Sequence, residues 1–198
     1  MDKFPGPLAA LQETARALEE LTTRYALVGG LAVSARAEVR FTRDVDVAVA
    51  VDDDAEAEAV VYGLKESGFL PITTVEQKRT KRLATARLES PNGTVVDLIF
   101  ATSGIEDEVV SRSQSVSLSP SLSVPVAQAE ELLAMKVLSM SDERLQDRID
   151  ARNLVLLNPS LELERVKQNL SLITERGFSR QQNLSRKLDQ LLEEIPGE

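Results

Sequence analysis

The chain of 198 residues carries a net charge of −9 and is 42% hydrophobic, which suffices for the core of one domain of ordinary size and argues mildly against broad, nonspecific nucleic-acid binding. It contains neither histidine nor cysteine, which excludes a histidine base, imidazole- or thiolate-bound zinc and disulfides, and leaves oxygen ligands that suit hard cations such as Mg²⁺. No apolar run is long enough to span a membrane and the N-terminus lacks the pattern of a signal peptide, so we expect a cytoplasmic protein.

The first 100 residues predict a mixture of helices and strands. Helices are expected where apolar residues recur every three or four positions, and strands where they alternate or form a short apolar run. In chain order the pattern predicts a helix at 7–21, a strand at 25–30, a short helix at 31–39, a strand at 44–51, a helix at 52–68 and strands at 69–75, 82–90 and 94–100. Pro7 lies in the first turn of the first helix, and Asn92-Gly93 marks a hairpin between the last two strands.

The second half of the chain predicts helices. Residues 102–125 are mixed and serine-rich, and no regular element is predicted there. Helical patterns follow at 126–140, 143–157, 161–174 and 179–192, and Asn158-Pro159 ends the second of them. We therefore expect a mixed α/β core at residues 1–125, followed by a helical region at residues 126–198 that packs on the core.

Two aspartates lie two positions apart on the predicted strand at 44–51. Asp44 and Asp46 share one face of it, with Cα atoms about 6–7 Å apart. The two carboxylates repel each other, and a divalent cation between them would relieve the repulsion. The alternative is an amphipathic strand whose acidic face meets solvent.

Asp97 lies in the otherwise apolar run TVVDLIF. Burying its charge is costly unless it is paired or bound to a metal, although this face of the strand can also be wet. If this strand lies beside that of Asp44 and Asp46, three carboxylates converge. They would then form the ligand set for two Mg²⁺ ions about 3.5–4 Å apart, as used in nucleotidyl transfer.

Gly29-Gly30 lies at a predicted strand-to-helix turn. Without Cβ atoms, backbone N–H groups there can approach a phosphate at a helix N-terminus. The alternative is a tight turn without a ligand.

These features together resemble a known superfamily. The pattern VGGLAV…RFTRDVDVAV…VVDLIF resembles the DNA polymerase β-like nucleotidyltransferases. The string T-x-D-x-D that begins at Thr42, with Lys136 and Asp147 further on, resembles more narrowly the AbiEii/AbiGii-type toxin nucleotidyltransferases of bacterial abortive-infection and toxin–antitoxin systems. The resemblance covers residues 25–154. Two positions depart from it, because many superfamily members have Gly-Ser at the glycine pair and the toxin pattern often has a basic residue at Gln146.

The resemblance implies a fold and an activity. The expected fold is α+β, with a polymerase-β-like nucleotidyltransferase core, a mixed β-sheet and a C-terminal helical region. The expected reaction is Mg²⁺-dependent transfer of a nucleoside monophosphate from an NTP to a hydroxyl of a tRNA 3′ end or a protein, with Mn²⁺ as a possible substitute metal. The expected role is a toxin with a cognate antitoxin. The alternatives are a lincosamide or aminoglycoside nucleotidyltransferase and a catalytically inactive nucleotide-binding module.

The resemblance also implies roles for individual residues. The nucleotide-binding residues would be Gly29 and Gly30 at the triphosphate, Thr42, Lys136 at the phosphates and Asp147 in the nucleotide pocket. The metal ligands would be Asp44, Asp46 and Asp97, and these three with Lys136 and Asp147 make up the catalytic set.

The residues themselves leave the roles of Lys136 and Asp147 open. Lys136 lies in an apolar helical run, so it must find an anion or extend to solvent. Asp147 and Asp150 share a helix face, and the alternative to a binding role is pairing with Arg144 and Arg148.

One dense basic stretch runs from Lys78 to Arg87 in this acidic chain. We expect it to meet a triphosphate or an RNA acceptor, and the alternative is a solvated β-turn. Alanine at Lys81 and Arg82 is then predicted to weaken substrate binding without unfolding the chain.

Overall fold

The computed structural model describes residues 6–195. Its helices are α1 (Gly6–Glu20), α2 (Gly29–Arg36), α3 (Asp54–Glu66), α4 (Glu106–Ser111), α5 (Ala129–Ser139), α6 (Leu145–Leu157), α7 (Leu163–Glu175) and α8 (Leu184–Glu193). Its strands are β1 (Tyr25–Val28), β2 (Asp44–Val49), β3 (Leu70–Glu76), β4 (Leu83–Glu89), β5 (Val95–Ile99), β6 (Gln114–Ser119) and β7 (Leu122–Val126).

The strands form one mixed sheet in the order β3-β4-β5-β2-β1-β7-β6. The pairs β2–β5 and β1–β7 are parallel, and the other neighbours are antiparallel. Every residue of β1 is buried, and so are Val45, Val47 and Val49 of β2. The centre of the sheet is therefore fixed by short apolar strands that cannot shift by one residue without exposing valines.

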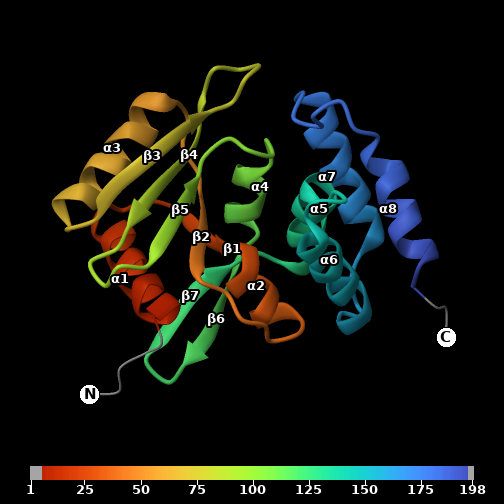
Figure 1. Ribbon diagram of the computed structural model, residues 1–198, viewed down its shortest axis with the longest axis horizontal. Coiled ribbons are helices and arrows are strands. Elements are labelled where there is room, and N and C mark those ends of the chain that lie inside the picture. Colours follow the sequence, from red (N-terminus) through yellow and green to blue (C-terminus); the bar gives the residue numbers. More distant parts are fainter. Residues whose placement is uncertain (1–5, 196–198) are drawn as a thin grey trace.

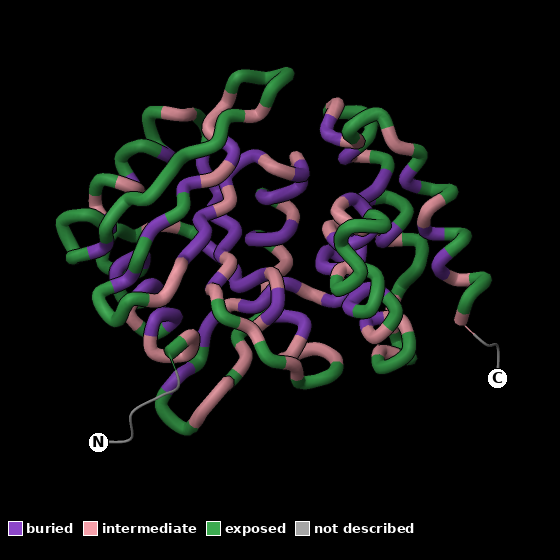
Figure 2. The backbone as a smooth tube through the Cα atoms, in the orientation of Figure 1, coloured by how far each residue is buried: buried purple, intermediate pink, exposed green. Residues whose placement is uncertain are grey.

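Helices cover both faces of the sheet. Figure 1 shows α1 and α3 against one face and α4 against the other, with α5 to α8 gathered beyond α4. Figure 2 shows buried backbone along the central strands, whereas β3 at the edge is exposed along its length. The core thus lies along β1 and β2. These buried strands hold in place the residues that follow Val28 and those that begin β2 at Asp44.

The C-terminal helices pack around α5, which contacts α2, α6, α7 and α8. Nine of its residues are buried. One of them, Glu131, accepts hydrogen bonds from Arg112 at the end of α4 and from Asn169 of α7. None of the helices in residues 6–195 has the length and apolar character needed to cross a lipid bilayer.

The expected α+β fold, with a mixed sheet followed by helices, is confirmed. Three details differ from the sequence prediction. The last helix, α8, begins at Leu184 rather than at residue 179, and residues 179–183 form a loop in which Arg180 and Gln181 have positive φ. The strand β1 ends at Val28, and the two glycines begin α2 rather than a separate turn. Residues 102–125, for which no element was predicted, contain α4, β6 and β7. The division of the chain at residue 125 stays a prediction.

Candidate active site

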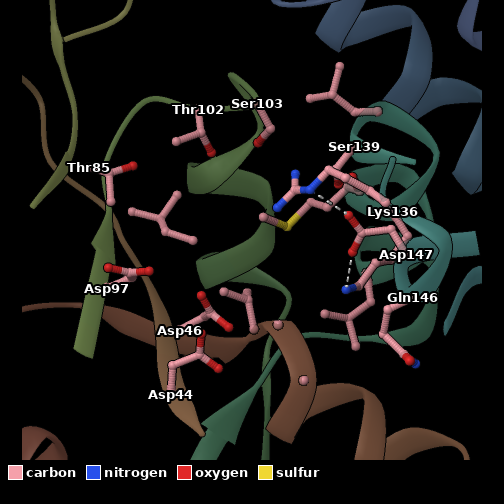
Figure 3. A pocket seen from close by; sticks show the side chains of 18 of the residues that line it. Asp44, Asp46, Thr85, Asp97, Thr102, Ser103, Lys136, Ser139, Gln146 and Asp147 are labelled. Carbon is pink, nitrogen blue, oxygen red and sulfur yellow. Dashed lines mark hydrogen bonds and ion pairs between the residues drawn. The ribbon is translucent and has the colours of Figure 1, made fainter. Parts of the chain in front are cut away.

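Three carboxylates converge on one side of the sheet. Asp46 of β2 and Asp97 of β5 are register partners in a parallel pair, and Asp44 precedes Asp46 by two residues on the same face. One carboxylate oxygen from each lies within 4.8 Å of the others. Figure 3 shows the three side chains together on one wall of a cleft. The sequence left open whether the strand of Asp97 lies beside the strand of Asp44 and Asp46. The two strands are neighbours, and their aspartates lie on the same face of the sheet.

The electrostatics of this cluster favour a bound cation. The pKa of Asp46 is raised to about 6, chiefly by burial and in addition by the neighbouring charges of Asp44 and Asp97. Lys136 and a backbone hydrogen bond from Gly30 oppose this effect. The three carboxylates repel one another, and Asp46 loses its proton less readily than an exposed aspartate. A hard divalent cation bound between them would neutralise this charge.

Arg87 is the nearest cation to this cluster. It is the register partner of Asp97 on β4, and its Nε and Nη2 donate to the two carboxylate oxygens at 2.8 and 2.7 Å. These bonds raise the pKa of the Arg87 guanidinium. Sequence reasoning placed Arg87 only in the basic stretch, because its pairing depends on the register of β4 against β5.

The glycine pair allows backbone and carboxylate to lie close together. Gly29 has φ +61°, and a Cβ there would lie 1.8 Å from Oδ2 of Asp46. A Cβ at Gly30 would lie 2.7 Å from Nη2 of Arg40 and 2.9 Å from the Thr42 hydroxyl. Both positions therefore require glycine for space, and Gly29 requires it for backbone conformation as well.

Thr42 holds the first aspartate in place. Its hydroxyl donates to Oδ1 of Asp44 at 2.9 Å, across the bend that leads into β2. This hydrogen bond links Thr42 directly to one member of the acidic cluster.

Lys136 and Asp147 lie on the opposite wall, on α5 and α6 (Figure 3). The Lys136 ammonium is 2.7 Å from Asp147 and 2.8 Å from Asp150, so this buried lysine is paired rather than extended into solvent. Asp147 also lies 3.3 Å from Arg144, which agrees in part with the pairing considered from the sequence.

Asp150 connects this wall to the loop before β2. It accepts two hydrogen bonds from Arg40, at 2.8 and 2.9 Å, and one from Gln146 at 2.9 Å. Burial raises the pKa of Asp150, but the bonds from Arg40, Lys136 and Gln146 outweigh burial and leave it below its usual value. Gln146 therefore supports a buried carboxylate at the position where the toxin pattern often has a basic residue.

A single cavity of about 810 Å³ joins the two walls. Its lining includes all eight residues singled out from the sequence, namely Gly29, Gly30, Thr42, Asp44, Asp46, Asp97, Lys136 and Asp147. Its sheet side, the acidic wall, holds the three aspartates together with Arg40 and Arg87. Its helical side, the basic wall, holds Lys136, Arg144 and Arg180 together with Glu143 and Asp147. Such a cavity can hold a polyanion against the basic wall while cations bind at the acidic wall.

Comparison with known proteins agrees with this geometry. The sequence model of a family described as the nucleotidyl transferase AbiEii toxin, of a type IV toxin–antitoxin system, matches residues 11–155. No curated protein matches the chain significantly.

Solved structures are similar to the chain at low sequence identity, and one of them has a TM-score above 0.5. ANT(2″)-Ia in complex with adenylyl-2″-tobramycin is 13% identical, over 85% of this chain and 97% of its own, with a TM-score of 0.52. A nucleotidyltransferase-like protein from Paracoccidioides brasiliensis is 21% identical over 91% of each chain, with a TM-score of 0.49. MenT4, a nucleotidyltransferase toxin from Mycobacterium tuberculosis, is 14% identical over 96% and 92%, with a TM-score of 0.38.

The family match covers most of the chain and includes every residue of the acidic and basic walls named above except Arg180. The chain belongs to the AbiEii nucleotidyl transferase toxin family.

Proposed function

We propose that the protein is a Mg²⁺-dependent nucleotidyltransferase that moves a nucleoside monophosphate from an NTP to an acceptor hydroxyl. The observation that carries the proposal is the convergence of Asp44, Asp46 and Asp97, with oxygens within 4.8 Å of one another. Asp44 and Asp46 would hold two Mg²⁺ or Mn²⁺ ions, and Asp97 would complete one of the two sites. Bound there, the ions would supply positive charge to the transferring phosphate and the leaving group.

The nucleotide would lie between the two walls. Its triphosphate would approach the first turn of α2, which begins at Gly29 and Gly30 and lines the cavity. Lys136 would contact the phosphates from the opposite wall, and Asp147 would help to form the nucleotide pocket. The Lys136–Asp147 ion pair keeps the ammonium directed into the cavity before the nucleotide arrives.

The proposed reaction forms one bond and breaks one. The acceptor hydroxyl oxygen bonds to the α-phosphorus, and the bond from the α-phosphorus to the bridging oxygen of the β-phosphate breaks, which releases pyrophosphate. Asp97 would accept the hydroxyl proton. Because Arg87 binds both Asp97 oxygens, it would fix the orientation of this carboxylate.

The biological role follows from the family rather than from the site. We propose that the protein acts as the toxin of a toxin–antitoxin or abortive-infection system, with a cognate antitoxin as its partner. The acceptor would be a tRNA 3′ end, with a protein hydroxyl as the second candidate.

The decisive experiment is a transfer assay. The protein is incubated with Mg²⁺, total RNA and each of the four labelled NTPs in turn, and compared with Asp46→Ala. We expect label in RNA with the wild type and none with the variant. Label in protein would identify a protein as the acceptor. If neither RNA nor protein gains label in a Mg²⁺-dependent way, the proposed activity is contradicted.

An antibiotic nucleotidyltransferase makes a different prediction in cells. Expression of a toxin slows growth, and Asp46→Ala restores it. An enzyme that modifies lincosamides or aminoglycosides would leave growth intact and raise tolerance to the drug. A binding module without activity would do neither, and would bind an NTP without releasing pyrophosphate.

A further inference from the structure

A second cavity of about 980 Å³ opens beside the candidate active site. One side is formed by the turn of the β3–β4 hairpin and the other by the loop between α7 and α8. Thr85, Thr102 and Arg180 line both cavities, so the two adjoin each other. The transfer of a nucleotide within the first cavity makes no use of the second.

The second cavity is basic in a chain whose net charge is −9. Lys78, Arg79 and Arg180 line it, and Glu76 is the single carboxylate among its lining residues. Within residues 6–195, none of these three cations takes part in an ion pair. By contrast, Lys136 and Arg87 in the first cavity are paired with carboxylates. The second cavity therefore has positive charge available for an external anion.

The structure holds these cations in position on both sides. In the hairpin turn, the Gln77 side chain accepts hydrogen bonds from the backbone N–H groups of Arg79 at 2.5 Å and Thr80 at 2.7 Å. The Arg79 guanidinium reaches across to the α7–α8 loop, where a Cβ at Gly177 would lie 1.8 Å from its Nη1. Figure 1 shows the hairpin tip leaning toward this loop.

Arg180 stands at the junction of the two cavities. It has φ +54° and the next residue, Gln181, has φ +60°, a left-handed backbone that non-glycine residues rarely adopt twice in succession. Removal from water and then the like charge of Arg144 lower the pKa of the Arg180 guanidinium. Arg79 and Arg180 line the second cavity together, and Glu76 is the one carboxylate among its lining residues, which favours a phosphate there.

We propose that the second cavity binds the sugar–phosphate backbone of a single-stranded RNA acceptor and leads its terminal hydroxyl to the aspartate cluster. This inference rests on the proposed function and adds the acceptor site to it. Successive phosphates would meet Lys78, Arg79 and Arg180, and the hydroxyls of Thr85 and Thr102 would lie beside the terminal nucleotide. A cationic aminoglycoside would be repelled along the same path.

The hairpin residues that carry this inference differ from those expected to matter from the sequence alone. Arg82 lies 3.4 Å from Asp54, and neither Arg82 nor Lys81 lines either cavity. We therefore expect weaker substrate binding from alanine at Lys78 and Arg79 rather than from alanine at Lys81 and Arg82.

The test measures RNA binding without chemistry. A fluorescein-labelled single-stranded RNA of about 12 nucleotides is titrated in EDTA with wild type and with Lys78→Ala/Arg79→Ala/Arg180→Ala. We expect the triple variant to bind at least tenfold more weakly, and the slope of log K against log salt to fall by about 2, since each phosphate contact on a single strand contributes about 0.7. The matched control is Arg24→Ala/Lys65→Ala/Arg152→Ala, which removes the same charge from residues that line neither cavity.

Each outcome decides the inference. Equal weakening in the triple variant and the control would mean that net charge alone binds RNA, and unchanged binding in the triple variant would also overturn the proposal. So would stronger competition by poly-glutamate than by unlabelled RNA, which would favour an acidic protein acceptor. If the triple variant does not fold, cross-linking of wild type to RNA that carries 4-thiouridine at the second and third nucleotides from the 3′ end should label 76–79 or 177–181, and label elsewhere would contradict the site. Binding in EDTA is independent of transfer, so loss of the proposed activity would be seen separately, as wild type that binds RNA but incorporates no label.

Discussion

Asp46 and Asp97 face each other across the parallel strands β2 and β5, as direct partners in the register. A shift of one residue would turn Asp97 to the opposite face of the sheet, where apolar side chains lie. The buried valines of β2 and the buried Val96 and Leu98 of β5 prevent this shift, because it would bring charge into the core. The packing of the sheet thus determines the geometry of the proposed metal site.

Divalent metal should stabilise the folded protein through this cluster. With Mg²⁺ or Mn²⁺ at about 100 times its dissociation constant, binding to the folded state adds about 2.7 kcal/mol, which thermal unfolding detects. EDTA should remove the gain. Asp46→Asn should abolish the response, whereas Asp189→Asn on exposed α8 should keep it. An equal response in both variants would place the metal elsewhere.

Without metal, Asp46 should make stability depend on pH. Its pKa is raised from 3.8 to about 6, chiefly by burial, so the folded state binds the proton more tightly than the unfolded chain. This contribution is fully present below pH 3.8 and is lost as the pH rises through about 6. Asp46→Asn should therefore be more stable than wild type at pH 7.5 in EDTA, by about 1–3 kcal/mol.

Urea unfolding at pH 7.5 and at pH 4 checks this expectation. The advantage of Asp46→Asn should shrink at pH 4, where wild type is largely protonated as well. If Asp46→Asn is less stable than wild type at pH 7.5, the ionised Asp46 carboxylate does not destabilise the folded protein.

The sequence predicted the aspartates because local patterns carry that information. The alternation of valines placed Asp44 and Asp46 on one face, and the Asn92-Gly93 turn predicted the hairpin that brings β4 beside β5. The pairing of β2 with β5 was left open, since parallel pairing depends on contacts between distant segments. Residues 102–125 were missed because the serines of β6 have low strand propensity, and its pairing with β7 overrides that preference.

The partners of the charged residues could not be predicted from local patterns. Arg40 and Asp150 are 110 positions apart and meet only when the loop before β2 packs on α6. Arg180 lies in the loop between α7 and α8, whereas the sequence pattern predicted that the last helix already begins at residue 179. Such contacts depend on how the C-terminal helices lie against the sheet.

Asp150 should be important for stability rather than for chemistry alone. Asp150→Ala leaves Arg40 and Lys136 without this partner in a buried setting, and removal of one member of a buried charge network costs about 3–5 kcal/mol. Glu164→Ala breaks an exposed pair with Lys167 and should cost much less stability than Asp150→Ala, because solvent screens the pair. Chemical denaturation of both variants compares them. If the two variants lose similar amounts of unfolding free energy, the ion pairs of Asp150 contribute no more to stability than an exposed pair does.

Gly29→Ala should disrupt the site more than the fold. A Cβ there would lie 1.8 Å from Oδ2 of Asp46, so the carboxylate or the turn must move. Gly93 is the matched control, because it also has positive φ, at +84°, and a Cβ there would meet nothing within 4 Å. Both alanine variants should lose about 1–2 kcal/mol of stability from backbone strain. Only Gly29→Ala should also lose Mg²⁺-dependent stabilisation and nucleotide transfer, by about 100-fold or more, since displacement by 1 Å can have that effect. Retention of both by Gly29→Ala would show that the close approach of this turn to Asp46 is not needed for metal binding.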